Sequence, residues 1–487
     1  MKAQLRFGNG PVEARSLKYV ANACCGQLAC GSEQTLIRRV VTDSRQTQPG
    51  DLFFALAGKR FDGHDFLGEV ASKGAAAVVV NREKAPTQLP ACAVVVVDDP
   101  RRALGRLATR YRQDFNLPVI AVGGSNGKTT VKELVSAVLR QRLETLWSEA
   151  SFNNDIGVPL TLLRLENRHQ VSVVEVGTNH PGELTALVKM LQPKFGVITN
   201  IGREHLEFFG DSAGVAQEEG SLAELLPADG MLFINGDCQW ADAIASRTMA
   251  RVVRVGLNPD NDWRAYDIAV GTRGVTFNVA APKTGFSGQY SVKLLGRHQA
   301  VNALFAIAIG ETFGLNQSEI RRGLAECSPP KMRLQLWQAG GVWVLDDTYN
   351  ANADSMTAAL QTLRELPCQG RRVAVLGDMA ELGAHSLAAH EEIGRVAAEL
   401  GVEQLFAVGQ MANVVARAAR TAGLVRIFEF ADVEAAANAV KHLVKPGDLV
   451  LLKASRIVGM ERVAEALRRG EMPRQCRRAR SAEKRGR

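Results

Sequence analysis

Residues 119–130 narrow the possible folds of this chain more than any other segment, and they read Val-Ile-Ala-Val-Gly-Gly-Ser-Asn-Gly-Lys-Thr-Thr. The leading apolar residues are typical of a buried strand, the glycines indicate a tight turn, and apolar spacing predicts a helix over residues 131–143. Strands that are apolar on both sides occur in parallel sheets with helices on both faces. The segment therefore predicts an α/β domain.

Short apolar runs elsewhere predict further strands of the same kind. The runs are 52–56, 75–80, 94–97, 171–176, 195–199, 231–235, 342–345, 372–376, 404–408, 426–429 and 449–452. A helix is expected over residues 16–28. One core cannot serve 487 residues, and one open sheet of this width would be unusual. We expect a small N-terminal α/β domain (1–97), a central parallel-sheet domain (98–330) and a C-terminal α/β domain (331–470).

Composition excludes several other classes of protein. With 46% hydrophobic and 23% charged residues the chain is ordinary for a globular protein, and its apolar runs are far shorter than the roughly 20 residues of a membrane span. Eight cysteines without paired spacing, and no apolar leader, indicate a reduced, cytoplasmic protein. Seven Lys or Arg against two Glu in residues 471–487 carry most of the net charge of +8. Without an aromatic residue to stack on bases, this basic tail is expected to be disordered and to bind no nucleic acid.

The glycine-rich turn is a candidate phosphate loop. Its residues are Gly124, Ser125, Asn126, Gly127, Lys128, Thr129 and Thr130. Backbone N–H groups would cradle phosphate, Lys128 would neutralise the β and γ oxygens, and the Thr129 hydroxyl would hold Mg²⁺. The spacing departs from the strict Walker pattern, since Val122 stands five positions before Gly127. The alternative is an incidental glycine-rich turn between a strand and a helix.

Two further polar residues follow predicted strands. Glu175 ends the strand at 171–176, and His205 lies just beyond the strand at 195–199. Carboxyl ends of parallel strands meet at one sheet edge, so both side chains are expected near the loop. Either residue alone could be structural, but their shared position favours a metal and phosphate site.

These residues resemble the ATP-dependent Mur ligases of peptidoglycan synthesis. The resemblance rests on the loop, Glu175, His205, Leu-Gly-Arg-His at 295–298 and Asn302, and covers about residues 38–465. More particular strings are Phe-Asn-Asn-Asp-Ile-Gly-Val-Pro (152–159), Glu-Val-Gly-Thr-Asn-His-Pro-Gly-Glu (175–183), Asp-Asp-Thr-Tyr-Asn-Ala-Asn (346–352), Leu-Gly-Asp-Met-Ala-Glu-Leu-Gly (376–383) and Lys-Ala-Ser-Arg (453–456).

The resemblance implies three domains: one for a UDP-sugar peptide, a P-loop ATPase and a C-terminal Rossmann-like domain. It implies an ATP-dependent peptide ligase that adds D-alanyl-D-alanine to UDP-N-acetylmuramoyl-tripeptide through an acyl phosphate, giving ADP and phosphate. This is the last cytoplasmic step in making the pentapeptide precursor. A monomer is expected, and the third residue of the acceptor peptide stays open between diaminopimelate and lysine.

Roles for individual residues follow from the same resemblance. Thr129 and Glu175 would bind a first Mg²⁺, and His205 a second. Asn302 would contact adenine, Asp347 the ribose and Arg333 the phosphates. The predicted substrate contacts are Ser44, Arg45 and residues 61–66 for the uridine nucleotide, Asn153 and Asn154 for the peptide, and Asn350, Asn352, Lys453, Ser455 and Arg456 for the dipeptide. For Lys453, Ser455 and Arg456 the alternative is a structural role at a strand end.

The sequence departs from the family pattern at three positions. Most Mur ligases carry a lysine, carbamylated to support the second metal, where this chain has Glu219. Glu219 either replaces the carbamate or is a surface residue beside a loose second-metal site. Ala353 stands where proline is common, and Ala454 where glycine is common, so a positive φ at 454 would strain alanine.

Other functions are compatible with parts of the pattern. A sibling ligase that adds the third residue, or a folylpolyglutamate synthetase, would share the loop, but the strings at 346–352 and 376–383 argue against both. A nucleotide-dependent regulatory protein that has lost catalysis is supported by Glu219 alone.

Overall fold

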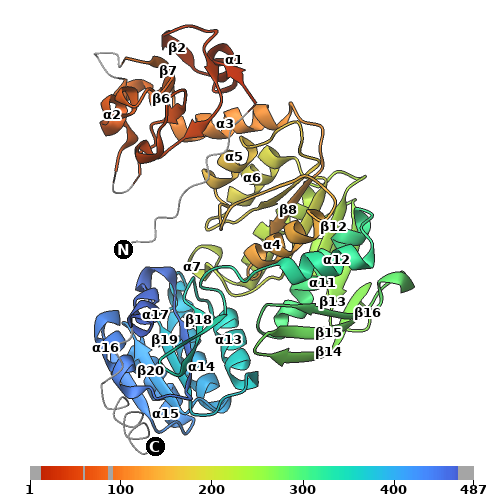
Figure 1. The fold of residues 1–487 in the computed structure, drawn as a ribbon, viewed down its shortest axis with the longest axis vertical. Coiled ribbons are helices and arrows are strands. Elements are labelled where there is room, and N and C mark those ends of the chain that lie inside the picture. Colours follow the sequence, from red (N-terminus) through yellow and green to blue (C-terminus); the bar gives the residue numbers. More distant parts are fainter. Residues whose placement is uncertain (1–12, 59–60, 86–90, 470–487) are drawn as a thin grey trace, which may run out of the picture.

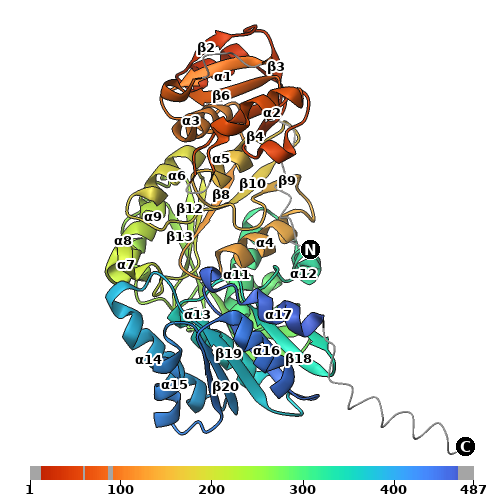
Figure 2. The ribbon, with the colours of Figure 1, turned by 90° about the vertical axis from the view of Figure 1, so that its left-hand side faces the viewer.

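The computed structural model describes residues 13–58, 61–85 and 91–469. Three α/β units follow one another along the long axis of the molecule, with the N-terminal and C-terminal units at opposite ends (Figure 1 and Figure 2). The predicted α/β class with three domains is confirmed. The basic tail predicted over residues 471–487 lies outside the described residues.

The N-terminal unit is built on a five-stranded sheet. In order across the sheet the strands are β2 (Gln27–Cys30), β7 (Ala93–Val97), β6 (Ala77–Asn81), β5 (Leu52–Phe54) and β4 (Val40–Val41). All are parallel except β2, which is antiparallel to β7. Helices α1 (Leu17–Ala23) and α3 (Pro100–Arg112) pack on one face and α2 (Leu67–Ser72) on the other. The short pair β1 (Arg15–Ser16) and β3 (Leu36–Ile37) is separate from this sheet.

The helix predicted over residues 16–28 is too long. Helix α1 ends at Ala23, Cys25 is left-handed with φ 53°, and β2 begins two residues later. Gly26 approaches β7 so closely that a Cβ there would lie 2.7 Å from Val97 Cγ1. The chain turns because it pairs with β7, a distant contact that local spacing does not encode.

The central unit holds a nine-stranded sheet. In order, the strands are β9 (Thr145–Trp147), β10 (Val171–Glu175), β8 (Val119–Gly123), β11 (Phe195–Ile198), β12 (Met231–Asn235), β13 (Arg251–Gly256), β14 (Trp263–Gly271), β15 (Gly274–Ala280) and β16 (Gly288–Val292). Helices α4 (Lys128–Leu139), α11 (His298–Thr312) and α12 (Gln317–Glu326) cover one face. Helices α3, α5 (Gly157–Leu162), α6 (Glu183–Leu191) and α9 (Ser221–Glu224) cover the other.

The sheet is parallel from β9 to β14, as predicted, but β14, β15 and β16 are antiparallel. This extension was not predicted. In β15, buried Val275, Phe277 and Val279 alternate with more exposed residues. A strand buried on one face lacks the continuous apolar run that marks a buried parallel strand.

The C-terminal unit holds a six-stranded sheet in the order β17 (Gln335–Ala339), β18 (Val342–Asp347), β22 (Leu449–Lys453), β19 (Arg372–Gly377), β20 (Gln404–Val408) and β21 (Ile427–Phe430). Only β17 is antiparallel to its neighbour. Helices α13 (Ala353–Glu365), α14 (Ser386–Glu399) and α15 (Ala412–Thr421) cover one face, and α16 (Val433–Leu443) and α17 (Glu461–Arg468) the other.

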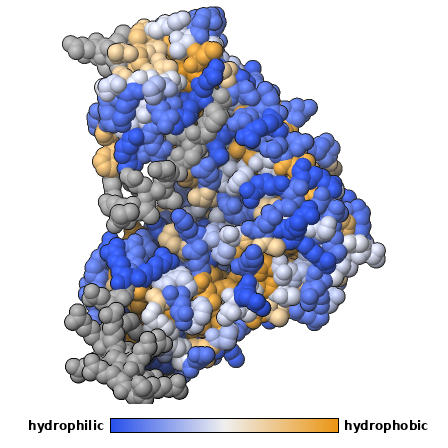
Figure 3. Space-filling model, in the orientation of Figure 1, coloured by the Kyte–Doolittle hydropathy of each residue, from blue (hydrophilic) through white to orange (hydrophobic). Residues whose placement is uncertain are grey.

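The central and C-terminal units meet through α7 (Leu206–Phe209), which lies beside the C-terminal unit in both views (Figure 1 and Figure 2). The face drawn in Figure 3 is mostly hydrophilic, as expected when the apolar residues fill the cores between layers. Within the described ranges, no helix has the length and apolar character needed to cross a membrane.

Candidate active site

The glycine-rich loop joins β8 to α4 at the carboxyl edge of the central sheet. Gly124 and Gly127 are left-handed, with φ 107° and 87°. A Cβ on Gly124 would lie 2.4 Å from Thr199 Oγ1, so the position accepts only glycine. The Ser125 N–H donates to the carbonyl of Asn200 at 2.8 Å. The residues after β11 therefore fix the shape of the loop.

Helix α4 begins at Lys128 and presents its first-turn amides to the loop. The N–H groups of Lys128, Thr129 and Thr130 have no carbonyl one turn back inside the helix, which makes this end a natural anion site. Lys128 Nζ donates to the carbonyls of Gly124 and Ser125, the latter at 3.1 Å. The lysine predicted to neutralise phosphate thus lies on the loop itself.

Three carboxylates lie around Lys128. Burial alone would lower the pKa of Lys128, but the negative charges of Glu204, Glu219 and Glu175 outweigh it and hold the pKa above its ordinary value. Glu204 is nearest, with Oε2 3.6 Å from Nζ, and burial raises the pKa of its own carboxyl. Sequence reasoning missed Glu204, although an acidic residue directly before His205, in the loop after a buried strand, was a usable signal.

Glu175 ends β10 opposite Val122 of β8, which places it at the edge that carries the loop. Its Oε1 accepts a hydrogen bond from Asn153 Nδ2 at 2.9 Å. Its Oε2 is buried and has no partner among the described residues. Such an atom is costly unless something satisfies it, and a cation would. Asn153, predicted to touch substrate, donates to this carboxylate, and Asn154 Oδ1 accepts from the Gly157 N–H at the start of α5 at 2.9 Å.

Glu219 is the last residue of α8 (Ser212–Glu219) and is buried at the loop. Its Oε2 accepts from the Gly124 N–H at 2.6 Å, and its Oε1 has no partner in the described part of the chain. Of the two alternatives for Glu219, a surface residue is therefore wrong, because the end of α8 packs against β8 and the loop. Burial raises the pKa of Glu219 to about 7, although the positive charge of Lys128 opposes the shift.

His205 starts α7 in the left-handed region, with φ 50°. Its Nδ1 is hydrogen-bonded to Glu381 of the C-terminal unit, and its Nε2 lies 3.9 Å from Glu204 Oε2. The second nitrogen therefore faces the side of the loop that holds Lys128.

The predicted magnesium ligands are Thr129, Glu175, His205 and Glu219. Among residues 13–58, 61–85 and 91–469, no three His, Cys, Asp or Glu side chains form a preassembled metal-binding group. The unpartnered oxygens of Glu175 and Glu219 nevertheless fit a hard divalent cation, which takes carboxylate oxygen ligands. Mg²⁺ takes oxygen ligands of this kind.

Arg333 reaches from the C-terminal unit to the phosphate loop. Its Nη2 donates to Thr129 Oγ1 at 3.0 Å, and its guanidinium carbon lies 4.1 Å from the ring centroid of Tyr349. Its neighbours Met332 and Leu334 are both left-handed, with φ 60° and 47°. Strained backbone of this kind is kept where a side chain must be aimed. The two units thus meet at the phosphate loop.

Two asparagines also contact the loop. Asn302, on α11, holds its Oδ1 2.9 Å from where a Cβ on Gly127 would stand. Asn352 caps α13 and donates from Nδ2 to Asn126 Oδ1 at 3.0 Å. Asn302 therefore lies against the loop at Gly127, and Asn352 joins the C-terminal unit to the loop.

Buried Lys453 and partly buried Asp347 form an ion pair at the ends of β22 and β18. Asp347 Oδ2 accepts from Lys453 Nζ at 2.5 Å, and its Oδ1 accepts from the Leu334 N–H at 3.2 Å. Lys453 also donates to the carbonyl of Asn350 at 3.0 Å. Both carboxylate oxygens and the ammonium already have partners, so the roles predicted for them toward ribose and dipeptide stay predictions.

Ser455 and Arg456 follow β22 and differ in exposure. Ser455 is buried, accepts from the Ala380 N–H at 2.8 Å and donates to the carbonyl of Ala351 at 3.0 Å. Arg456 is exposed, with Nη1 3.5 Å from Glu461 Oε1. Ser455 therefore fixes loops, whereas Arg456 is accessible to an anionic ligand.

The two alanine departures are well accommodated. Ala353 is the first residue of α13, a position that favours proline but does not need it. Ala454 is buried and is not among the described residues with positive φ. The backbone strain that a positive φ would impose on alanine is therefore absent at this position. Neither change disturbs its loop.

Ser44 and Arg45 belong to the N-terminal unit. That unit lies apart from β8 and α4, which flank the phosphate loop (Figure 1). Ser44 is buried, and its carbonyl accepts from Lys73 Nζ at 2.9 Å. Arg45 is exposed and pairs with Asp43 at 2.7 Å. In the segment 61–66, His64 Nδ1 bonds Asp62 at 2.6 Å. The predicted role in binding a uridine nucleotide stays a prediction.

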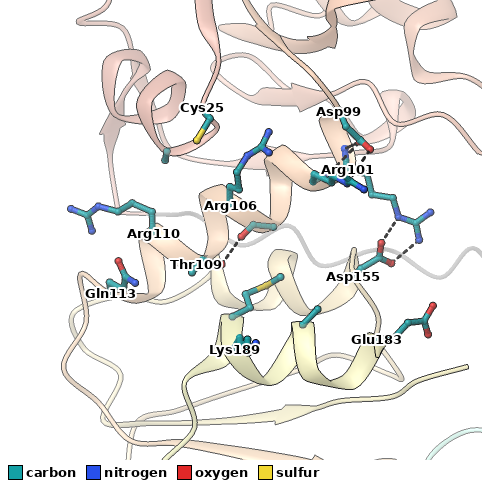
Figure 4. A pocket seen from close by; sticks show the side chains of 15 residues that line it. Cys25, Asp99, Arg101, Arg106, Thr109, Arg110, Gln113, Asp155, Glu183 and Lys189 are labelled. Atoms are coloured by element: carbon teal, nitrogen blue, oxygen red, sulfur yellow. Dashed lines mark hydrogen bonds and ion pairs between the residues drawn. The ribbon is translucent and has the colours of Figure 1, made fainter. Parts of the chain in front are cut away.

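A groove of about 810 Å³ runs between α3 and α6, away from the loop (Figure 4). Its arginines are matched by carboxylates: Arg101 pairs with Asp155, and Arg106 with Asp98. None of the predicted site residues lines this groove.

Comparison with known proteins covers nearly the whole chain. Family models match at residues 36–112 (Mur ligase family, catalytic domain), 122–310 (Mur ligase middle domain) and 332–456 (Mur ligase, glutamate ligase domain). The UDP-N-acetylmuramoyl-tripeptide–D-alanyl-D-alanine ligase of Escherichia coli (strain K12) is 39% identical over 460 residues, which are 93% of this chain and 98% of the relative.

Two solved structures are also similar. MurF from Acinetobacter baumannii has a TM-score of 0.85 at 31% identity, covering 94% of this chain and 100% of that one. The MurF ligase of Thermotoga maritima in complex with ADP has a TM-score of 0.76 at 25% identity, covering 88% and 97%.

Proposed function

The chain belongs to the Mur ligase family, and we propose that it is an ATP-dependent ligase that joins D-alanyl-D-alanine to UDP-N-acetylmuramoyl-tripeptide in the cytoplasm, releasing ADP and phosphate. The observation that carries this proposal is the meeting of two units at one phosphate loop, where Arg333 reaches Thr129. A site split between two units can close around substrates and exclude water. The names of its relatives supply the substrates.

The chemistry requires an activated acid, because a carboxylate does not react with an amine until one of its oxygens can leave. In the first step a carboxylate oxygen of the tripeptide attacks the γ-phosphorus of ATP, and ADP leaves. In the second step the dipeptide nitrogen attacks the carbonyl carbon and loses a proton, and the phosphate leaves with the carboxylate oxygen. Lys128 and Arg333 place positive charge where an anion approaches a polyanion.

Thr129 and Glu175 would hold a first Mg²⁺, and His205 with Glu219 a second. Bound Mg²⁺ would neutralise phosphate charge during transfer. The unpartnered oxygens of Glu175 and Glu219 support this assignment. Asn302 would contact adenine, Asp347 the ribose, and Arg456 the dipeptide carboxylate, with the dipeptide entering near Asn350 and Asn352.

Glu219 would replace the carbamylated lysine of other family members. Its burial beside Gly124 and Lys128 supports this role, since it supplies a carboxylate at the loop without CO₂. We expect activity at low pH to be indifferent to bicarbonate, and Glu219→Lys to become dependent on it. Wild-type activity that falls on bicarbonate removal and returns on its addition would refute the replacement.

The test of function mixes ATP, UDP-N-acetylmuramoyl-tripeptide and D-alanyl-D-alanine and follows phosphate release and product mass. We expect release only with all three substrates, and a product heavier by the dipeptide less one water. Release that ignores omission of the dipeptide would indicate a simple ATPase. Tripeptides ending in diaminopimelate or lysine, compared in parallel, identify the third residue.

A further inference from the structure

The contact between His205 and Glu381 joins the phosphate site to the C-terminal unit. His205 belongs to the loop after β11, whereas Glu381 follows β19, 176 residues further along the chain. Glu381 Oε2 is bonded to His205 Nδ1. Because an ionised carboxylate can only accept, the histidine must donate from Nδ1. In the neutral ring, Nε2 then carries the lone pair, on the side of Glu204 and Lys128.

The backbone around Glu381 is built to hold this contact. Glu381 is left-handed, with φ 60°, and its carbonyl accepts from the Glu207 N–H at 3.1 Å. Gly383 has φ 50°, and a Cβ there would lie 3.1 Å from Glu207 Cα. The loop after β19 therefore touches α7 through its backbone as well as through the Glu381 side chain.

Other contacts hold the two units together without touching His205. Arg203 pairs with Asp354 on α13 at 2.8 Å and with Glu392 on α14 at 2.6 Å. Docking of the units is thus served by one set of residues, and orientation of the imidazole by another.

We propose that Glu381 is a positioning residue for His205: its carboxylate fixes the imidazole with Nε2 toward the phosphate site, and does so only when the C-terminal unit is docked. The proposal rests on the metal-binding role of His205 in the proposed function. Histidine ligands commonly donate their other nitrogen to a carboxylate, which sets the tautomer and ring orientation. Here that carboxylate comes from another domain, so domain docking and the metal site are linked.

The experiment compares Glu381→Ala and Glu381→Gln with the control Glu392→Ala, which removes an ion pair between the units and leaves His205 untouched. Two readouts need no ligation: the ¹⁵N NMR tautomer of His205, assigned by comparison with His205→Gln, and the Mn²⁺ affinity of the protein with ADP, followed by the EPR signal of free Mn²⁺. Thermal unfolding checks that each variant is folded.

We expect His205 to hold its proton on Nδ1 in the wild type, and to lose this preference in Glu381→Ala with Mn²⁺ affinity lowered by about 10- to 100-fold. Glu381→Gln keeps a hydrogen-bond acceptor and should recover part of the tautomer preference and part of the Mn²⁺ affinity. Glu392→Ala should leave the tautomer unchanged and alter the Mn²⁺ affinity by less than about 3-fold. An unchanged tautomer and affinity in Glu381→Ala, or equal losses in Glu392→Ala, would overturn the proposal. If the variants change the His205 tautomer and the Mn²⁺ affinity as expected but the wild type forms no ligation product, the proposed ligase function is refuted and the role of Glu381 is not.

Discussion

Replacing Glu219 with glutamine should make the nucleotide-free protein increasingly stable relative to wild type as pH rises, while impairing the site. The ionised carboxylate is buried, and burial raises its pKa from the ordinary 4.5 to about 7. Glutamine can still accept from the Gly124 N–H, but it carries no charge to desolvate. The wild-type carboxylate therefore lowers the free energy of unfolding, a trade-off that is common for side chains that bind a ligand in an active site.

The size of the effect follows from the two pKa values. Because the folded state holds the proton more tightly, wild-type stability falls as pH rises through the interval from 4.5 to about 7, and stays lower above it. At 1.36 kcal/mol per unit the full difference is about 3 kcal/mol, of which about 2 kcal/mol develops between pH 5 and pH 8. The amide NH₂ of glutamine would lie where Oε1 lacks a partner in the described part of the chain. A buried NH₂ without an acceptor lowers the free energy of unfolding of the variant by about 1–3 kcal/mol, roughly equally at every pH.

The assay is calorimetry of the nucleotide-free protein at several pH values, following the transition that ADP shifts upward. Relative to wild type, Tm of Glu219→Gln should rise by roughly 4–8 °C between pH 5 and pH 8. The matched control is Glu218→Gln: Glu218 is also buried but accepts from the amides of Gly182 and Leu184 at 2.8 and 2.9 Å, so its loss should lower Tm. A Tm difference for Glu219→Gln that is flat with pH would refute the reasoning.

Three further variants test the site. Lys128→Ala should lower kcat by about 100- to 1,000-fold while the protein stays folded, because it removes charge stabilisation at the phosphates; a near-normal rate would remove the loop from the mechanism. Arg333→Ala should lower kcat/KM for ATP by about 10- to 100-fold, and Arg333→Lys should recover little, since lysine lacks the planar fork that contacts Thr129 and Tyr349; full rescue by lysine would mean that charge alone matters. Lys453→Met should lower the free energy of unfolding by about 3–5 kcal/mol, because it leaves Asp347 without its buried partner. Denaturant titration measures this loss, and an unchanged midpoint would contradict the pairing.

Much of the fold could be predicted because it depends on sequence patterns of a few neighbouring residues. The phosphate loop, the buried parallel strands and the positions of Glu175 and His205 after them depend on runs of a few residues. The antiparallel strands β14, β15 and β16 were missed because their apolar residues alternate, and the end of α1 was missed because β2 pairs with a strand far along the chain.

The parts of the site that were missed or wrongly placed depend on contacts between distant segments. Glu381 was part of a quoted motif, but its bond to His205 appears only when two domains meet. Glu219 was predicted at the right position in the chain, whereas its burial depends on how α8 packs against the loop. The hydrogen bond from Asn153 to Glu175 was not predicted, because it joins residues 22 positions apart in the chain. The predicted contact of Asn153 with substrate stays a prediction.

The central claim is that ATP bound at this loop phosphorylates the tripeptide carboxylate before the dipeptide amine attacks its carbonyl carbon. The most direct measurement uses UDP-N-acetylmuramoyl-tripeptide with ¹⁸O in its terminal carboxylate and follows the label by mass spectrometry. The account predicts one ¹⁸O atom in each phosphate released and one retained in the new amide carbonyl. Phosphate that carries no ¹⁸O would contradict it.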